Sequence, residues 1–235
     1  MSKKKMLMRK FGSILPNIET NGLLFWLDSE IESSYSGSGT IWTDLIGGKN
    51  CDIIDGVYNG TTKTINFNAP DQYINVPSLT VTPNNGYTFT TFLKLPTFHN
   101  SGNPGFWRYI DGVNIGSFNI LQYGAGLQRA PWIRSNNNEI LKPTSGYVLP
   151  LSQYLMISFV VKSNDYANFY VNGVEKHTAN HSIIQDSFIV NYLNYQLSTA
   201  ENIFADYKSL LFYNRPLAAT ELLNNYNILS NFYTL

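Results

Sequence analysis

Short apolar runs, separated by turn residues, are the feature that most constrains the fold of this 235-residue chain. The runs at 23–27, 87–95 and 155–161 are rich in aromatic and β-branched residues and too short for buried helices, which favours strands. Clusters of Gly, Pro, Asn and Ser separate such runs at roughly 8–12-residue intervals, the spacing of a β-sandwich. Only 14% of the residues are charged, against about 25% in an average domain. The sequence therefore predicts an all-β fold.

The clearest turn lies at Asn172-Gly173, between the strand-like segments 167–171 and 174–178. Both residue types tolerate a positive φ, which the two central positions of a type I′ turn require. We therefore expect a two-residue hairpin here.

A second hairpin is expected between 64–68 and 73–76, which both alternate apolar and polar residues. Pro70 and Asp71 lie between them and favour a turn. These two strands are therefore predicted to be neighbours in one sheet.

One helix is expected near the end of the chain. Pro216 ends the strand-like run 207–213, because proline cannot donate to a sheet ladder. Helical spacing then places four apolar residues on one face, with Asn224 and Asn227 opposite them. These four are Leu222, Leu223, Tyr226 and Leu229. Thr220 is able to cap the start of a helix of about ten residues, and the Glu221 carboxylate suits its first turn.

Three segments carry a resemblance to a known family. They are GLLFWLD at 22–28 with SYSGSGTIWTDL at 34–45, FYVNGV at 169–174, and LFYNRPLAATEL at 211–222. Taken together, in this order, they resemble the concanavalin A-like lectin/glucanase superfamily in its laminin-G-like branch. The resemblance covers about residues 21–229. It implies a jelly-roll sandwich of two antiparallel sheets with one short C-terminal helix.

The opening and closing segments are similar to laminin-G-like domains of tailed-phage virion proteins. This resemblance implies a non-catalytic capsid-decorating, fibre or tail component, made in the host cytoplasm and located in the virion. Its partners would be other virion subunits in a larger assembly, and its lectin-like domain could bind host-surface glycans. A free carbohydrate-binding lectin is the alternative function, followed by a glucanase-type glycoside hydrolase.

A basic N-terminal arm at 1–20 is expected to precede the sandwich domain at 21–235. Its cations are Lys3, Lys4, Lys5, Arg9 and Lys10. Such an arm can contact an acidic partner or simply keep the chain soluble. We expect it to anchor the domain to other subunits, with neither nucleic acid nor membrane as partner. The N-terminus has no apolar run of signal-peptide length, and no stretch approaches a membrane span.

The sequence is not typical of an enzyme. Asp28, Glu30 and Glu32 have the spacing of a glucanase carboxylate pair, but they follow a strand and run into a Ser/Gly loop. We interpret them as a solvated strand end. Cys51, the only cysteine, is interpreted as a turn or buried thiol. His177 and His181 lie about 13 Å apart if their segment is extended, too far to share a metal.

No cofactor is expected, with calcium as the one candidate. The possible ligands are Asp44, Asp52, Asp55 and Asp71, because a hard cation prefers loop oxygens. Turn capping explains the same four residues.

Aromatic residues in the middle of the chain are the candidate glycan- or protein-binding surface. They are Trp107, Tyr109, Tyr123 and Trp132, with Arg134 beside them. Exposed aromatic rings among amide and charged side chains suit either ligand. Trp26 and Trp42 are instead expected in the core.

Overall fold

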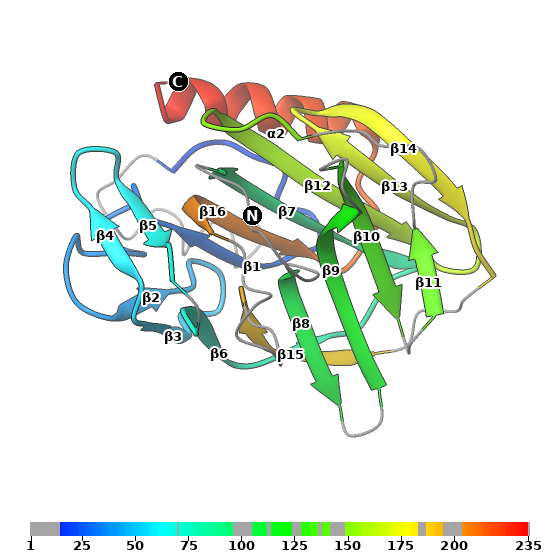
Figure 1. The fold of residues 1–235 in the computed structure, drawn as a ribbon, viewed down its shortest axis with the longest axis horizontal. Coiled ribbons are helices and arrows are strands. Elements are labelled where there is room, and N and C mark those ends of the chain that lie inside the picture. The colour runs from blue at the N-terminus through cyan, green and yellow to red at the C-terminus, as the bar shows by residue number, and fades with distance from the viewer. Residues whose placement is uncertain are drawn as a thin grey trace.

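The computed structural model describes residues 15–69, 71–95, 105–111, 114–123, 128–135, 138–141, 149–182, 187–194 and 204–234. For the strands between 105 and 140, only the backbone is described. Two antiparallel sheets form a sandwich, as the sequence predicts, and one helix lies on its outside (Figure 1).

Sheet A has the order β14-β13-β12-β7-β16-β5-β4, with β1 also paired to β16. Its strands are β1 (Leu23–Asp28), β4 (Val57–Asn59), β5 (Thr64–Phe67), β7 (Gly86–Lys94), β12 (Tyr154–Lys162), β13 (Tyr166–Val171), β14 (Val174–Asn180) and β16 (Ala205–Tyr213). β1 and β16, the first and last strands of the described residues, thus pair in the middle of sheet A.

Sheet B has the order β11-β10-β9-β8-β15-β6-β3-β2. Its strands are β2 (Ile41–Thr43), β3 (Asn50–Ile54), β6 (Tyr73–Val81), β8 (Gly105–Asp111), β9 (Asn114–Tyr123), β10 (Gln128–Ser135), β11 (Asn138–Leu141) and β15 (Phe188–Leu193). The predicted hairpin between 64–68 and 73–76 is wrong, because β5 lies in sheet A and β6 in sheet B. The residues between these strands carry the chain from one sheet to the other.

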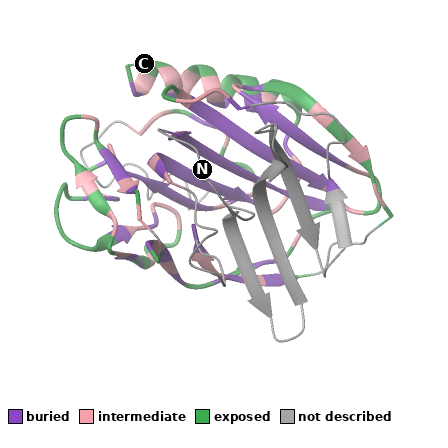
Figure 2. Cartoon of the chain, in the orientation of Figure 1, coloured by how far each residue is buried: buried purple, intermediate pink, exposed green. Residues whose placement is uncertain are grey.

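The main core lies between the sheets. Inward residues of sheet A such as Phe89, Phe159 and Phe212 are buried there, as is Trp42 of sheet B. Figure 2 shows buried residues along the whole length of the central strands of sheet A. Strands buried on both faces have continuous apolar runs, which explains why these strands were the easiest to predict.

A second core lies on the outer face of sheet A, under the helix α2 (Ala219–Phe232). Leu222 and Leu229 pack there with Trp26, Phe92 and other buried residues. The predicted helix is confirmed, but it is longer than expected, and one residue was assigned to the wrong face. Leu223 is 43% exposed.

Asn225 takes the buried position that was expected for Leu223. Its Oδ1 accepts a hydrogen bond from the Glu19 amide at 2.8 Å, and its Nδ2 donates to Tyr213 Oη at 3.1 Å. The backbone carbonyl of Glu19 in turn accepts from Tyr213 Oη at 3.0 Å. Ile18 is also buried in this second core, so residues 18 and 19 of the expected arm are fastened to the sandwich.

The start of α2 differs from the prediction in one respect. Ala218 is the N-cap residue, so Thr220 lies inside the first turn and does not cap the helix. The Glu221 carboxylate does satisfy an unpaired amide, accepting from Ala218 N at 2.7 Å. Arg215 forms a bidentate pair with Glu221, at 2.9 and 2.7 Å.

The hairpin at Asn172-Gly173 is confirmed, with Val171 paired to Val174. The φ values of the two turn residues are 53° and 74°, as a type I′ turn requires. Glycine is also needed for space, because a Cβ there would lie 2.5 Å from Leu223 Cα of α2. The turn therefore abuts the helix.

Candidate binding face

The outer face of sheet B presents two tyrosines side by side. Leu193 on β15 and Ile74 on β6 are register partners, and both are fully buried in the main core. Side chains alternate between the faces of a strand, so the neighbouring Tyr192 and Tyr73 point outward. Both are half-buried, and their rings meet edge to face with centroids 5.8 Å apart.

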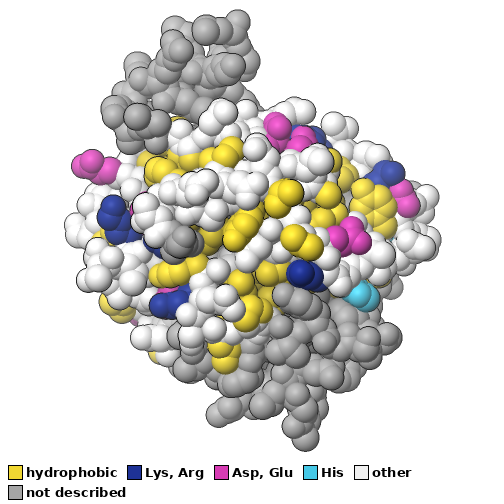
Figure 3. Space-filling model, turned by 90° about the horizontal axis from the view of Figure 1, so that it is seen from above, with side chains coloured by type: hydrophobic (Ala, Val, Ile, Leu, Met, Phe, Trp, Pro, Cys, Tyr) yellow, Lys and Arg dark blue, Asp and Glu magenta, His cyan; other side chains and the backbone are white. Residues whose placement is uncertain are grey.

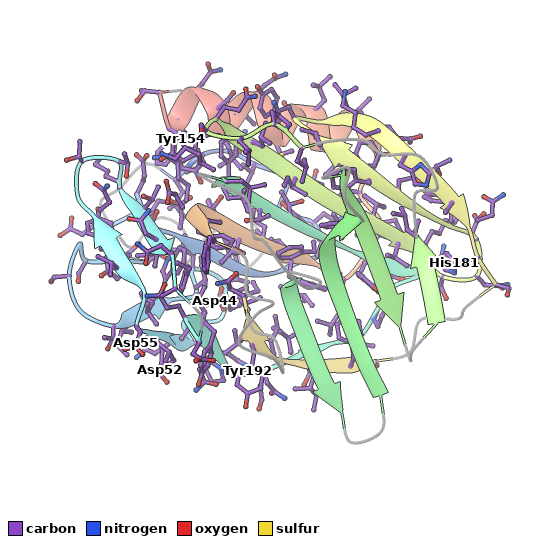
Figure 4. All side chains as sticks on the ribbon, in the orientation of Figure 1. Asp44, Asp52, Asp55, Tyr154, His181 and Tyr192 are labelled. Atoms are coloured by element: carbon purple, nitrogen blue, oxygen red, sulfur yellow. The ribbon has the colours of Figure 1, made fainter. Side chains whose placement is uncertain are left out.

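A carboxylate and an amide lie beside this pair. Asn75 is the register partner of both Tyr192 and Asp52, so three strands contribute to one line across the sheet. Asn75 Nδ2 donates to Asp52 Oδ2 at 3.4 Å. Figure 4 labels Tyr192 and Asp52 on this part of the molecule. We call Asp52, Tyr73, Asn75 and Tyr192 the outer patch.

The register extends this line across the rest of sheet B. Tyr192 pairs with Arg108, Arg108 with Ser117, and Ser117 with Arg134. Arg134, one of the predicted binding residues, thus shares a register line with the outer patch. Trp107 is instead the register partner of the buried Leu193.

The other predicted binding residues are Tyr109 on β8, Tyr123 on β9 and Trp132 on β10. The side chains of all five candidates lie outside the described residues, as do Lys3, Lys4, Lys5, Arg9 and Lys10 of the arm. These assignments stay predictions. Sequence reasoning missed Tyr73, Asn75 and Tyr192.

The carboxylates considered for glycosidase chemistry do not form a solvated strand end, so that interpretation is wrong. Asp28 is fully buried and accepts hydrogen bonds from Tyr233 Oη at 2.7 Å and from the Glu30 amide at 3.0 Å. Burial raises the pKa of Asp28 from its usual 3.8 to about 7, although both hydrogen bonds oppose the shift. Only Glu32 is exposed.

Glu30 is held by an internal ion pair with Lys208, whose side chain is only 4% exposed. Lys208 Nζ also donates to the Thr62 carbonyl at 2.8 Å and lies over the rings of Tyr154 and Tyr233 at 5.3 and 5.1 Å. A buried ammonium needs such compensation. Asp28 and Glu30 therefore serve the packing of the C-terminal residues against the first and last strands.

Asp44 is a buried turn cap. Its carboxylate accepts from the amides of Trp26, Ile46 and Gly47 at 2.9, 3.0 and 2.7 Å. Burial is the main cause of its raised pKa, against those hydrogen bonds. Asp55 and Asp71 have positive φ values of 53° and 65°.

In the part of the chain that the structure describes, no group of three or more His, Cys, Asp and Glu residues could hold a metal ion. Cys51 is fully buried on β3, and burial raises the pKa of its thiol to about 12. A thiol with that pKa is a poor nucleophile near neutral pH.

The family is decided by a match over most of the sandwich. Residues 67–222 match the model of the concanavalin A-like lectin/glucanases superfamily. The chain belongs to this superfamily. Curated protein sequences gave no significant match. Among the described residues of this concanavalin A-like domain, no helix is both long and apolar enough to cross a membrane.

Solved structures with the same fold include catalytic and binding proteins. A Trypanosoma rangeli sialidase superposes with a TM-score of 0.67 at 13% identity, over 97% of this chain and 38% of its own. The present chain thus spans well under half of that enzyme. Domain 4 of AbnA, a GH43 arabinanase from Geobacillus stearothermophilus solved with arabinotriose, has a TM-score of 0.63 at 16% identity, covering 88% of this chain and 99% of its own.

A third structure is the binding domain of Paraclostridial Mosquitocidal Protein 1. It has a TM-score of 0.54 at 16% identity, over 89% of this chain and 53% of its own. At these identities the likeness establishes the fold alone.

Proposed function

We propose that this chain is a non-catalytic carbohydrate-binding module that holds its glycan on the outer patch of sheet B. The observation that carries the proposal is the edge-to-face pair of Tyr73 and Tyr192, with Asn75 and Asp52 in line beside it. A tyrosine ring offers an apolar face to the C–H groups of a sugar. The amide and carboxylate offer a donor and acceptors to its hydroxyls.

A solved domain of similar size and fold supports the proposal. Domain 4 of AbnA matches almost in full length, and it was solved with arabinotriose bound. A domain of this size and fold can therefore hold an oligosaccharide without a catalytic domain attached.

The absence of catalysis is part of the proposal. Asp28 contacts Tyr233 in the interior, and Glu30 pairs with Lys208. A retaining or inverting glycosidase needs two carboxyl groups that both reach the sugar. Neither of these two is placed to do so.

A role as a virion component is the second candidate function, and the basic arm favours it. Five cations within the first ten residues suit attachment to an acidic surface of another subunit. This function is compatible with glycan binding, because a virion component can use the outer patch for host-surface glycans. Detection of the chain in purified particles would test it, and absence from all particle fractions would contradict it.

Glycan binding is tested by screening the full chain against immobilised oligosaccharides and then measuring affinity for the best ligand by calorimetry. Tyr192→Ala should weaken binding at least about fivefold, because stacking on an aromatic ring supplies roughly 1 kcal/mol or more. Tyr192→Phe keeps the ring and should retain most of the affinity.

The matched control is Tyr166→Ala, which removes another half-buried tyrosine, on sheet A. It should leave binding unchanged. Equal losses of affinity in both alanine variants would refute the proposed site. Failure of the unaltered chain to bind any glycan would refute the proposed function. Hydrolysis of the bound glycan would refute the non-catalytic assignment.

A further inference from the structure

The exposed face of α2 carries no charged side chain. Its exposed residues inside the helix are Ala219, Thr220, Leu223, Asn224, Asn227 and Asn231. Glu221, the only charged residue of the helix, is held by Arg215 at its N-terminal end. A solvated surface helix normally presents charged residues opposite its buried face. This helix presents amides, hydroxyls and apolar groups instead.

These residues form a single stripe. Thr220, Asn224, Asn227 and Asn231 follow one another at intervals of three or four, so they lie in one row along the helix. The row points directly away from the buried Leu222 and Leu229. We call Thr220, Leu223, Asn224, Asn227 and Asn231 the neutral stripe.

Helix stability does not explain the asparagines. Asparagine is a poor helix former, and each one costs about 0.5 kcal/mol relative to alanine in an exposed helical position. The side chains of Asn224, Asn227 and Asn231 make no hydrogen bond within the described part of the molecule. Their amides thus have donors and acceptors available for another molecule.

Apolar surface adjoins the stripe. Leu223 is 43% exposed, and Val174 of the neighbouring hairpin turn is 51% exposed. The contact of Gly173 with Leu223 places the turn against the helix. Figure 3, which looks onto this side of the molecule, shows hydrophobic side chains across its middle, with separate charged side chains around and beside them. Depletion of charge at the centre of a patch is typical of a protein interface.

We propose that the neutral stripe is a dimer interface, at which α2 packs against α2 of a second copy of this chain. A two-fold interface must be complementary to itself. An asparagine amide meets this condition, because it both donates and accepts and so can pair with the same side chain on the partner. A stripe with one sign of charge would repel its own copy, and this stripe has none.

The size of the stripe predicts a weak dimer. A helix of 14 residues is about 21 Å long, and one helix face with a hairpin turn buries less than the roughly 800 Å² per partner of a standard interface. We therefore expect a concentration-dependent equilibrium between monomer and dimer. Because α2 covers sheet A, the two copies of sheet B would face away from each other, and the dimer would crosslink ligands.

The test is sedimentation equilibrium of the full chain over a wide concentration range. Asn227→Lys and Asn227→Glu should each weaken self-association at least about tenfold, because like charges would meet across the two-fold axis. Both replacements are better helix formers than asparagine, so folding is retained and can be checked by circular dichroism. A mixture of the two variants should associate again, because opposite charges then face each other. Ser38→Glu, in an exposed loop, is the control and should associate as the unaltered chain does.

Three outcomes would overturn the proposal. The unaltered chain could remain monomeric at every concentration. Both charged variants could associate as strongly as the control, which would place the interface elsewhere. Removal of residues 1–14 could abolish association in a chain with an intact stripe, which would make the arm the contact.

Discussion

The outer faces of the two sheets have opposite characters. On sheet A, α2 covers an apolar surface, and two lysines form internal ion pairs, Lys94 with Asp206 at 2.9 Å and Lys208 with Glu30. On sheet B, aromatic and polar side chains such as Tyr192 and Asp52 lie on a face that no described helix covers. Composition alone does not distinguish them, since both faces carry tyrosines and acids. The difference is burial: the side chains of sheet A lie under α2 or in internal ion pairs, whereas Tyr192 is half-buried and Asp52 is exposed.

This difference separates stabilising residues from binding residues. Tyr233, the C-cap residue of α2 on the sheet A side, donates to a buried carboxylate and packs on Phe92 with ring centroids 5.0 Å apart. Tyr192 on sheet B has its ring at the surface beside an amide. Substitutions on sheet A should therefore change stability, and substitutions in the outer patch should change binding.

The largest stability effect is expected on the covered side. Leu222→Ala should lower the free energy of unfolding by about 2–5 kcal/mol, because it leaves a cavity under α2. Leu223→Ala, the adjacent and exposed leucine, should cost less than about 1 kcal/mol. Denaturant titration measures both. Equal effects would mean that the helix does not pack as described.

The free energy of unfolding should depend on pH through Asp28, which lies on the same side of the molecule. The folded-state pKa of Asp28 is about 7, above its usual 3.8. Between about pH 4 and 7 the Asp28 carboxyl is therefore protonated in the folded chain and ionised in the unfolded chain. Stability from this group is present at acidic pH, falls between about pH 4 and 7, and is constant above that range. The slope should approach 1.4 kcal/mol per pH unit in that window.

Asp28→Asn is the variant that isolates this effect, because it keeps an acceptor for Tyr233 without the ionisation. Its stability relative to the unaltered chain should rise with pH across the same window. Glu221 has a lowered pKa through its hydrogen bonds with Arg215, and its contribution is lost at acidic pH in both proteins. A difference between the two proteins that does not vary with pH would contradict the assignment.

The fold was largely predictable because strands buried on both faces are marked by uninterrupted apolar runs. β1, β7, β12 and β16 are of this kind, and the Asn172-Gly173 hairpin follows from local backbone preference. The placement of β5 and β6 in different sheets could not be read from their alternation. A period of two shows that one face is buried, but not against which sheet.

The site was less predictable, because its residues meet only through strand register. Asp52, Asn75 and Tyr192 are brought together by pairings between β3, β6 and β15. Asp28 was misjudged for a similar reason. Its partner Tyr233 is 205 residues away in the sequence, and nothing near Asp28 indicates that a tyrosine covers it.

The smallest expected changes in stability come from replacing asparagines on the two faces of α2. Asn225→Ala removes the acceptor of the Glu19 amide and the donor to Tyr213, and a buried unsatisfied group costs about 1–3 kcal/mol. Asn227→Ala removes an exposed side chain, so the loss of interactions within the monomer is negligible and alanine should favour the helix by about 0.5 kcal/mol. Thermal unfolding at a concentration low enough to keep the chain monomeric would compare them. A loss of stability with Asn227→Ala under those conditions would show that its amide already has a partner within the monomer, and the neutral stripe would then have no role left for a second copy.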